Sequence, residues 1–489
     1  MKILLVNPPF LKNYSRQSRS PCVTKSGTLY FPYFLAYTTG AAEKAGFEAK
    51  LVDAIISGLT PEKAAETAKE FAPDLIVLDT STPSIYNDVR FAEALKKALP
   101  GAHITLTGTF PTNMPEYTLK LSKEIDSVCR GEYDYTVVEL AKTLERNGDM
   151  KSVKGLAYLK NGKMTVTEPR PPIADLDELP FVSAVYKKHL GEALMKKYFY
   201  ASVTWPYIQV LTARGCPYNC AFCNSPFKNS YRARSIKNVA DEFEYIQNEL
   251  PFVSEVMLED ETFPAQKQRT LELCAELVKR KIRVKWSCNA RVNTDLETLK
   301  AMKGAGCRLL CVGFESAVQT QLNSVSKGTT KDMQTEFMEN TRKAKLLVNG
   351  CFILGLPEDT AETMQATIDF AKELNPNTAQ FYPLMVYPGT KAYEWAKEKG
   401  YLSTEDFSKW ITPEGLHSTT ISRPGLTNQE LIERCNNARL QFYTGRKYLL
   451  KVAGQALTNP KEAIRIAKGG SVLVSHLFRT AVKKKQVKK

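Results

Sequence analysis

The first 145 residues alternate between short apolar runs and longer stretches in which apolar residues recur every three or four positions. A continuous apolar run predicts a strand buried on both faces, and the longer spacing predicts an amphipathic helix. We therefore predict an α/β domain of the doubly wound, Rossmann-like kind. The predicted strands are 2–7, 48–54, 74–80 and 103–108, and the predicted helices are 33–47, 61–72, 87–99 and 136–148.

This alternation stops between residues 146 and 200, where an Asn-Gly pair at 161–162 predicts a hairpin ahead of a proline-rich linker. Between residues 201 and 400 six apolar runs return with helical stretches between them, which predicts a partial (β/α)6 barrel whose functional groups lie at the carboxyl ends of the strands. Beyond residue 400 the pattern is helical. The predicted segments are thus 1–145, 146–200, 201–400 and 401–489.

Composition places the chain among globular proteins of more than one domain. It has 489 residues, of which 43% are hydrophobic and 24% charged. Eleven cysteines without a regular spacing predict a reducing compartment, and hence the cytoplasm, rather than a secreted disulfide scaffold. No uninterrupted apolar stretch reaches about 18 residues, so we expect no transmembrane span.

Most of the formal charge of +15 lies at the C-terminal end, because twelve Lys or Arg and a single acid follow residue 444. Apolar residues are mixed with basic ones over 464–489, which is typical of a helix lying on an anionic membrane surface. A solvated cationic end is the alternative. Nucleic acid is disfavoured as a partner, since no recognisable RNA-binding module accompanies the charge.

Three cysteines, Cys216, Cys220 and Cys223, form a C-x3-C-x2-C pattern just after the first apolar run of the second series. A structural zinc site normally has four protein ligands, and no fourth is evident. Three thiolates on a 4Fe-4S cluster would instead leave one iron free to bind a small molecule. A zinc site or a simple iron–sulfur site remains the alternative. Cys288, at a predicted strand end, is the other thiol that could reach the site.

The cysteine loop, with Phe222 just before its last cysteine, resembles the signature of radical S-adenosylmethionine (radical SAM) enzymes. In that family the open iron chelates SAM, and an electron from a reductant such as flavodoxin or ferredoxin cleaves the sulfonium. The product is a 5'-deoxyadenosyl radical that abstracts hydrogen from the substrate. The resemblance implies a 4Fe-4S cluster and SAM as cofactors, with Cys216, Cys220 and Cys223 as the cluster ligands.

The resemblance extends over nearly the whole chain, to the radical SAM subgroup with an N-terminal cobalamin-binding-type domain. The segments "VGFES", "CFILGLP" and "LEDETF" each resemble a motif of that subgroup. The motif in "LEDETF" implies that Asp260 and Glu261 lie near the active face as catalytic candidates, although an acid there could equally cap a helix. The residues expected around SAM are Phe222, Asn289, Arg291, Glu315, Ser316 and Leu354.

The N-terminal domain departs from the cobalamin pattern, because the first histidine, His103, lies within a strand-like run and no D-x-H-x-x-G loop is present. Two alternatives remain open. Cobalamin binds base-off against the strand ends, or the domain is empty. The residues expected to hold it are Thr80, Ser81, Thr82 and Gly108.

Within the subgroup, "DTSTPSIYNDVRFAEALKKALPG" and "RGEYDYTVVELA" resemble the hopanoid-biosynthesis branch associated with cyclitol ether ring contraction. We therefore expect a radical SAM enzyme that rearranges, cyclises or couples a lipid-like or polycyclic metabolite. Cobalamin-dependent C-methylation is the alternative, and a non-catalytic metal-binding scaffold is a further one. A methylthiotransferase is disfavoured, because only Cys22 and Cys129 precede the motif, whereas that class brings three more cluster cysteines.

Overall fold

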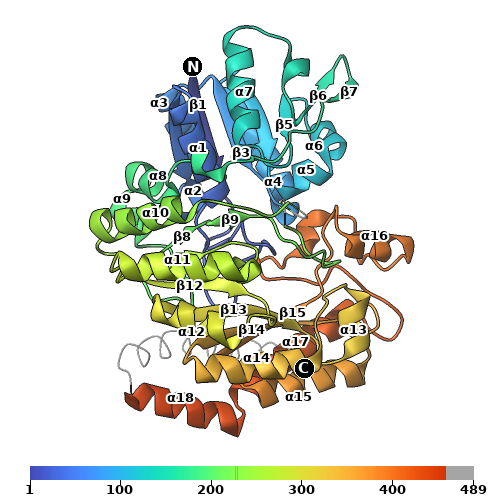
Figure 1. Ribbon diagram of the computed structural model, residues 1–489. Helices are drawn as coiled ribbons and strands as arrows, with labels where there is room; N and C mark the ends of the chain where they lie inside the picture. The colour runs from blue at the N-terminus through green and yellow to red at the C-terminus, as the bar shows by residue number, and fades with distance from the viewer. Residues whose placement is uncertain (226, 228–229, 459–489) are drawn as a thin grey trace.

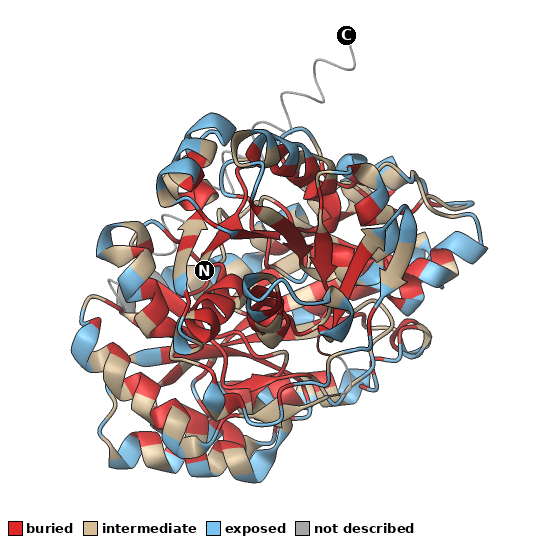
Figure 2. Cartoon of the chain, turned by 90° about the horizontal axis from the view of Figure 1, so that it is seen from above, coloured by how far each residue is buried: buried red, intermediate tan, exposed pale blue. Residues whose placement is uncertain are grey.

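The computed structural model describes residues 1–225, 227 and 230–458, which form two large, mainly parallel sheets with helices packed around them (Figure 1). Buried positions concentrate in the strands and on the inner faces of the helices, while the outer helical faces are exposed (Figure 2). The predicted fold class is confirmed: a doubly wound N-terminal sheet, a partial barrel of six parallel strands and a helical C-terminal region.

The N-terminal sheet has the order β2-β1-β3-β4-β5-β6-β7, with β1 to β5 parallel. Its central strands β1 and β3 are almost wholly buried, as their continuous apolar runs require, because α1 packs with α7 and α8, and α3 with α4. The parallel strands are β1 (Lys2–Asn7), β2 (Glu48–Asp53), β3 (Leu75–Asp79), β4 (His103–Thr107) and β5 (Ser127–Cys129). The helices are α1 (Tyr33–Lys44), α2 (Ala54–Ser57), α3 (Pro61–Phe71), α4 (Ile85–Ala98), α5 (Thr109–Asn113), α6 (Pro115–Leu121), α7 (Asp134–Glu145), α8 (Val182–His189) and α9 (Gly191–Met195).

The predicted hairpin forms from β6 (Leu156–Lys160) and β7 (Lys163–Val166), with Asn161 and Gly162 both at positive φ as a tight hairpin turn requires. Strand β6 pairs antiparallel with β5, so the first sheet continues past residue 145. The four segment boundaries drawn from the sequence stay predictions.

The second sheet has the order β15-β14-β13-β12-β11-β8, and all its pairs are parallel. Phe352 stacks on Phe314 and Phe381, with ring centroids 5.4 Å apart in each pair. Side chains alternate along a strand, so the residues directly before and after each phenylalanine in its own strand face the opposite side of the sheet. The strands are β8 (Tyr207–Val210), β11 (Glu255–Leu258), β12 (Lys285–Ala290), β13 (Cys307–Glu315), β14 (Leu347–Leu354) and β15 (Thr378–Pro383). The helices are α10 (Ile236–Glu249), α11 (Lys267–Lys279), α12 (Leu296–Gly304), α13 (Gln319–Ser324), α14 (Lys331–Lys343), α15 (Ala361–Leu374) and α16 (Lys391–Glu398).

A long connection between β1 and α1, residues 8–32, joins the two sheets. The Phe31 N–H donates to Gln209 Oε1 at 2.7 Å, and the Tyr207 hydroxyl donates to the Leu29 carbonyl at 2.6 Å. The Phe31 ring stacks on Tyr198 with centroids 3.7 Å apart. Core residues of both sheets therefore form one continuous apolar cluster. The sequence pattern did not predict this connection.

The helical C-terminal region begins with α17 (Asn428–Tyr443), which packs on β15, and continues with α18 (Arg446–Thr458). Thr427 and Glu430 form a capping box that starts α17. The helical pattern expected beyond residue 400 is here two helices, interrupted at Thr444 and Gly445. The basic segment predicted over 464–489 lies outside the described residues. Within the described part, none of the helices is both long and apolar enough to cross a membrane.

Candidate active site

The three predicted cluster cysteines lie on one loop between β9 (Ala213–Arg214) and β10 (Arg232–Ala233). All three cysteines are half-buried, and the Cys223 N–H donates to the Cys220 carbonyl at 3.1 Å. Burial raises the pKa of the Cys216 thiol, and the negative charges of Cys223 and Cys220 raise it further, so the three sulfurs are electrostatic neighbours. Among the described residues, no group of three His, Cys, Asp or Glu side chains is arranged to hold a single metal ion.

A glycine sets the start of this loop. Gly215 has φ +93°, and a Cβ built on it would lie 2.3 Å from the Ser230 carbonyl oxygen. Only glycine fits a backbone packed this closely at positive φ. The two ends of the loop therefore touch through their main chains.

Glu261 holds the same loop through its carboxylate, which accepts hydrogen bonds from the Gly215 N–H at 3.1 Å and the Ser225 hydroxyl at 2.8 Å. Asp260 is only 1% exposed, and its carboxylate accepts from the Thr212 N–H at 2.7 Å and hydroxyl at 2.6 Å. Both acids predicted as catalytic lie beside the cysteine loop with their carboxylates engaged inside the fold. Their catalytic role stays a prediction.

Sequence reasoning missed Glu259, which lines the cavity beside the cysteine loop. It accepts a hydrogen bond from Gln209 Nε2 at 3.1 Å, and burial raises the pKa of its carboxyl. Residues 255, 257, 259 and 261 lie on one face of β11 and of the segment that continues it, because side chains alternate along an extended chain. That alternation was the signal that could have separated Glu259 and Glu261 from Asp260.

Arg291 lies beside the cysteine loop. Its Nη1 lies 3.7 Å from Cys220 Sγ, and its guanidinium stacks 3.7 Å from the Tyr218 ring centroid. Its buried Nε has no hydrogen-bond partner within the described structure. A buried cation beside these thiols, with a donor still unused, fits a negatively charged cluster with an anionic ligand.

Glu315 faces a lysine that sequence reasoning missed. Its φ of +64° is unusual for a residue other than glycine, and its Oε1 lies 2.6 Å from Lys327 Nζ in a buried pair. Arg291 donates to the Lys327 carbonyl, which joins the pair to the cysteine loop. Residues held in rare backbone regions cluster at functional sites.

The other residues expected around SAM serve different contacts. The Ser316 hydroxyl lies 3.1 Å from the Thr367 hydroxyl and accepts the Val318 N–H, and Asn289 donates to the Asp260 carbonyl at 3.0 Å. Leu354 is fully buried, whereas Phe222 is half-buried beside Cys223. Their roles toward SAM stay predictions. Cys288 is buried and lies beside Cys307 rather than on the cysteine loop.

The residues expected to hold cobalamin lie at the carboxyl ends of β3 and β4. Gly108 has φ +112°, and a Cβ there would lie 2.1 Å from the Thr80 carbonyl oxygen, so the two strand-end loops touch. The buried Thr80 hydroxyl has no partner in the described structure. Ser81 contacts the Tyr14 hydroxyl at 2.8 Å, and Thr82 begins a buried 3-10 turn. A glycine edge with an unused hydroxyl fits a polar cofactor at the usual binding edge of such a sheet.

Part of this crevice is covered by the connection between β1 and α1. Arg16 forms a buried ion pair with Asp88 at 3.1 Å, and Gln17 donates to Asp79 at 2.8 Å. The cavity left open has a volume of about 50 Å³, whereas pockets for drug-sized ligands measure about 300–1,000 Å³. Residues 16–19 form part of its wall, and the space that they leave is smaller than a molecule of cobalamin's size.

That cavity is nevertheless shared by the two parts of the molecule. Its walls come from the strand ends of the N-terminal sheet, from the β1–α1 connection and from the cysteine loop with its acidic neighbours. The residues on these walls include Arg16, Arg19, Asp79, Thr80, Gly108, Gly131, Asn224, Ser225, Glu259 and Glu261.

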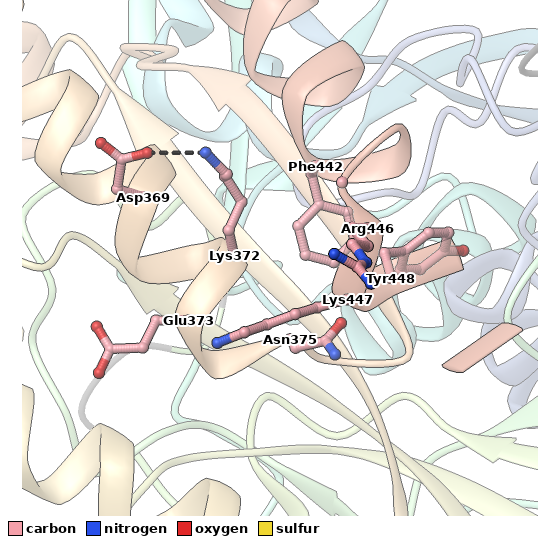
Figure 3. Close-up of a pocket in the computed structure, with 9 residues that line it drawn as sticks. Asp369, Lys372, Glu373, Asn375, Phe442, Arg446, Lys447 and Tyr448 are labelled. Atoms are coloured by element: carbon pink, nitrogen blue, oxygen red, sulfur yellow. Dashed lines mark hydrogen bonds and ion pairs between the residues drawn. The ribbon is translucent and has the colours of Figure 1, made fainter. Parts of the chain in front are cut away.

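A second hollow of about 310 Å³ lies between the end of α15 and the α17–α18 connection (Figure 3). Asp369 pairs with Lys372 at 3.0 Å on its rim, and Phe442 and Tyr448 form part of its wall. Because Glu373 and Asn375 precede β15, this hollow lies at the amino ends of the barrel strands. The cysteine loop lies at the opposite ends.

Two family models match this chain. Residues 19–141 match the B12 binding domain, and residues 210–371 match the radical SAM superfamily. An uncharacterised methyltransferase of Pyrococcus horikoshii is 31% identical over 92% of this chain and 94% of its own. The chain belongs to the radical SAM superfamily. Radical SAM enzymes use a 4Fe-4S cluster and SAM, which confirms the predicted enzyme class and these two cofactors, and the B12-binding match supports cobalamin as a third.

Further relatives and a solved structure resemble this chain. An anaerobic magnesium-protoporphyrin IX monomethyl ester cyclase of Cereibacter sphaeroides is 31% identical over 84% of this chain and 67% of its own. The hopanoid C-3 methylase of Methylococcus capsulatus is 24% identical over 82% of this chain and 77% of its own, so a hopanoid-related protein is among the relatives. The radical SAM methyltransferase TsrM of Kitasatospora setae, solved with cobalamin and a [4Fe-4S] cluster bound, shares the fold with a TM-score of 0.68. It is 17% identical, and 90% of this chain and 88% of TsrM are covered.

Proposed function

We propose that this chain is a cobalamin-dependent radical SAM C-methyltransferase. The observation that carries the proposal is the single cavity with walls from both the cobalamin-type crevice and the cysteine loop. When bound, the cluster with SAM supplies a hydrogen-abstracting radical and cobalamin supplies a methyl group. A methyl group can reach a substrate radical only if both groups face the same space.

The residues of this chain have distinct roles in the proposal. Cys216, Cys220 and Cys223 hold the cluster, and Arg291 offsets its negative charge. Lys327 and Glu315 present opposite charges toward the carboxylate and amino groups of SAM. At the other wall, the strand-end loops at Thr80 and Gly108 receive cobalamin after the covering segment has moved. Closure of that segment excludes water from the radical.

Rearrangement or ring formation on a lipid-like or polycyclic metabolite is the second candidate. The cyclase relative favours ring formation by its name, whereas the hopanoid C-3 methylase favours a polycyclic substrate but a methylation reaction. The methyltransferase relative covers more of this chain at equal identity, so methylation ranks first. In both candidates a small-molecule substrate enters the shared cavity, and a flavodoxin or ferredoxin supplies the electron.

The co-products of SAM separate the two candidates. Anaerobically reconstituted protein is incubated with SAM and a chemical reductant, with and without hydroxocobalamin. Methyl transfer predicts S-adenosylhomocysteine that depends on cobalamin, together with 5'-deoxyadenosine. 5'-Deoxyadenosine without any cobalamin-dependent S-adenosylhomocysteine would favour the second candidate. Absence of both products would contradict both candidates.

We also propose that the C-terminal region contacts an anionic membrane surface. Leu449 and Leu450 on α18 are 53% and 65% exposed, and the basic segment of the sequence follows them. An exposed apolar pair that is followed in the sequence by a lysine-rich segment suits a lipid surface. Co-sedimentation with anionic but not with neutral vesicles, lost on truncation after residue 458, is the expected result. Equal binding of the truncated protein would contradict it.

A further inference from the structure

The cysteine loop rests on a short antiparallel ladder in which two arginines face each other. Strands β9 and β10 pair only through Arg214 with Arg232 and Ala213 with Ala233. The side chains of Arg214 and Arg232 are 2% and 15% exposed. Like charges directly opposite on a ladder repel, and little water is present to screen them. This ladder therefore requires a counter-charge from elsewhere in the fold.

Glu132, from the N-terminal domain, supplies that counter-charge to both strands. Its Oε1 accepts from Arg214 Nη1 at 2.7 Å, and its Oε2 accepts from Arg232 Nη1 at 2.8 Å. Asp134 accepts a second contact from Arg214 Nη1 at 2.6 Å. Both carboxylates are 5% exposed. Charge-assisted hydrogen bonds of this kind are short and directional, so they fix the positions of β9 and β10, the two stems of the cysteine loop.

The contacts around this cluster leave it little freedom. The Ile173 N–H donates to Glu132 Oε2 at 2.9 Å, and Arg232 also donates to the Ile173 carbonyl at 2.6 Å. The Arg214 guanidinium lies 5.1 Å from the Tyr37 ring centroid and 5.3 Å from that of Phe227. These rings fix the plane of the guanidinium while the carboxylates fix its edge.

The cluster also connects the wall of the shared cavity to a cysteine. Gly131, the residue before Glu132, lines the cavity at the N-terminal strand ends. Arg214, at the other end of the contact, precedes Cys216 by two residues and adjoins Gly215, whose φ is +93°. A ligand that presses on the loop at Gly131 would therefore shift the carboxylate that holds both stems of the cysteine loop.

We propose that Glu132 and Asp134 are positioning residues for the iron–sulfur site, acting through Arg214 and Arg232, and that they couple occupancy of the N-terminal crevice to the geometry of Cys216. This inference rests on the proposed function, since it takes Cys216 as a cluster ligand. Residues that orient metal ligands in this indirect way typically change metal affinity or activity by about 10–100-fold when they are substituted.

The test compares reconstituted full-length variants by the EPR spectrum of the reduced cluster and by the rate of 5'-deoxyadenosine formation from SAM. Glu132→Gln is expected to alter the spectrum and to slow the rate about 10–100-fold. Glu132→Asp keeps the charge while withdrawing the carboxylate by one methylene, so it should fold and show a smaller change in the same direction. Added hydroxocobalamin should change the rate less in both variants than in the wild type.

Glu255→Gln is the matched control. Glu255 is also a buried carboxylate in an ion pair, with Arg308 at 2.8 Å. It lies in the barrel that carries the cysteine loop, but at the start of β11, away from the cysteines. This substitution should lower thermal stability and leave the EPR spectrum unchanged. Spectra and rates for Glu132→Gln and Glu132→Asp that match those of Glu255→Gln would overturn the inference. Failure of the proposed function can be told apart from failure of this inference. In that case the wild type itself would form no cobalamin-dependent S-adenosylhomocysteine.

Discussion

Replacing Gly215 by alanine should damage the iron–sulfur site while leaving most of the fold intact. The new Cβ would lie 2.3 Å from the Ser230 carbonyl oxygen, 2.5 Å from its carbon and 2.9 Å from the Phe227 carbonyl oxygen. All three are main-chain atoms, so no side-chain rotation can relieve the clash. The loop must open at the point where its first cysteine begins.

The magnitude follows from two costs. An L-residue at φ +93° costs about 1–2 kcal/mol in the left-handed region. Forcing a methyl group into filled space costs about 1–3 kcal/mol more. Their sum, about 2–5 kcal/mol, lowers the equilibrium ratio of native to opened loop at least about 30-fold, because about 1.4 kcal/mol corresponds to a factor of ten. The loss is local, because the three atoms nearest to the methyl group belong to the loop itself.

The assay is iron and acid-labile sulfide per chain after anaerobic reconstitution, followed by the rate of SAM cleavage. Gly162→Ala is the matched control: its φ is +74° and a Cβ there meets nothing within 4 Å, so it carries the backbone strain without the clash. We expect the control to bind iron as the wild type does and Gly215→Ala to bind much less. Wild-type iron content and SAM cleavage in Gly215→Ala would refute the reasoning.

Three further predictions follow from other contacts. Cys220→Ala should abolish 5'-deoxyadenosine formation. The control Cys288→Ala, which changes a buried thiol beside Cys307, should keep this activity. Retained activity in Cys220→Ala would contradict the assignment of Cys220 as a cluster ligand. Glu315→Gln should raise the KM for SAM about 10-fold or more, because it removes the negative charge that pairs with Lys327 at 2.6 Å. The EPR spectrum of the SAM-free enzyme should not change. An unchanged KM would exclude Glu315 from SAM binding. Burial raises the pKa of Asp79 to about 7, above about 3.9 in an unfolded chain, so its contribution to stability is present below about pH 4 and is lost as the pH rises through 7. Between pH 5 and 8 the free energy of unfolding of the wild type should therefore fall by about 2–3 kcal/mol more than that of Asp79→Asn, as measured by thermal unfolding. Parallel pH profiles of the two proteins would show that Asp79 is not protonated in the fold.

The sequence predicted the two sheets because their strands are continuous apolar runs and their helices keep a helical period. It also predicted the cysteine loop, since C-x3-C-x2-C is a local pattern. Glu259 was within reach of the same reasoning, because alternation along β11 separates it from Asp260. That step requires knowing which face of the strand is the interior.

Other parts of the site had no local signal. Glu132 and Arg214 are 82 residues apart in the chain, and either one alone reads as a solvated charge. Lys327 meets Glu315 only because the strand ends of the barrel converge there. Residues 8–32 carry no periodic pattern, although they bind both sheets and cover the crevice. Contacts between distant segments decide these features, and one sequence does not display them.

The central claim is that one cavity serves both the cysteine loop and the cobalamin-type crevice. EPR spectroscopy of reconstituted protein that holds cob(II)alamin and the reduced cluster together tests it most directly. Two unpaired spins at a shared cavity should interact, so the account predicts a spectrum split or broadened relative to the sum of the separate signals. Tight cobalamin binding with a spectrum equal to that sum would contradict the account.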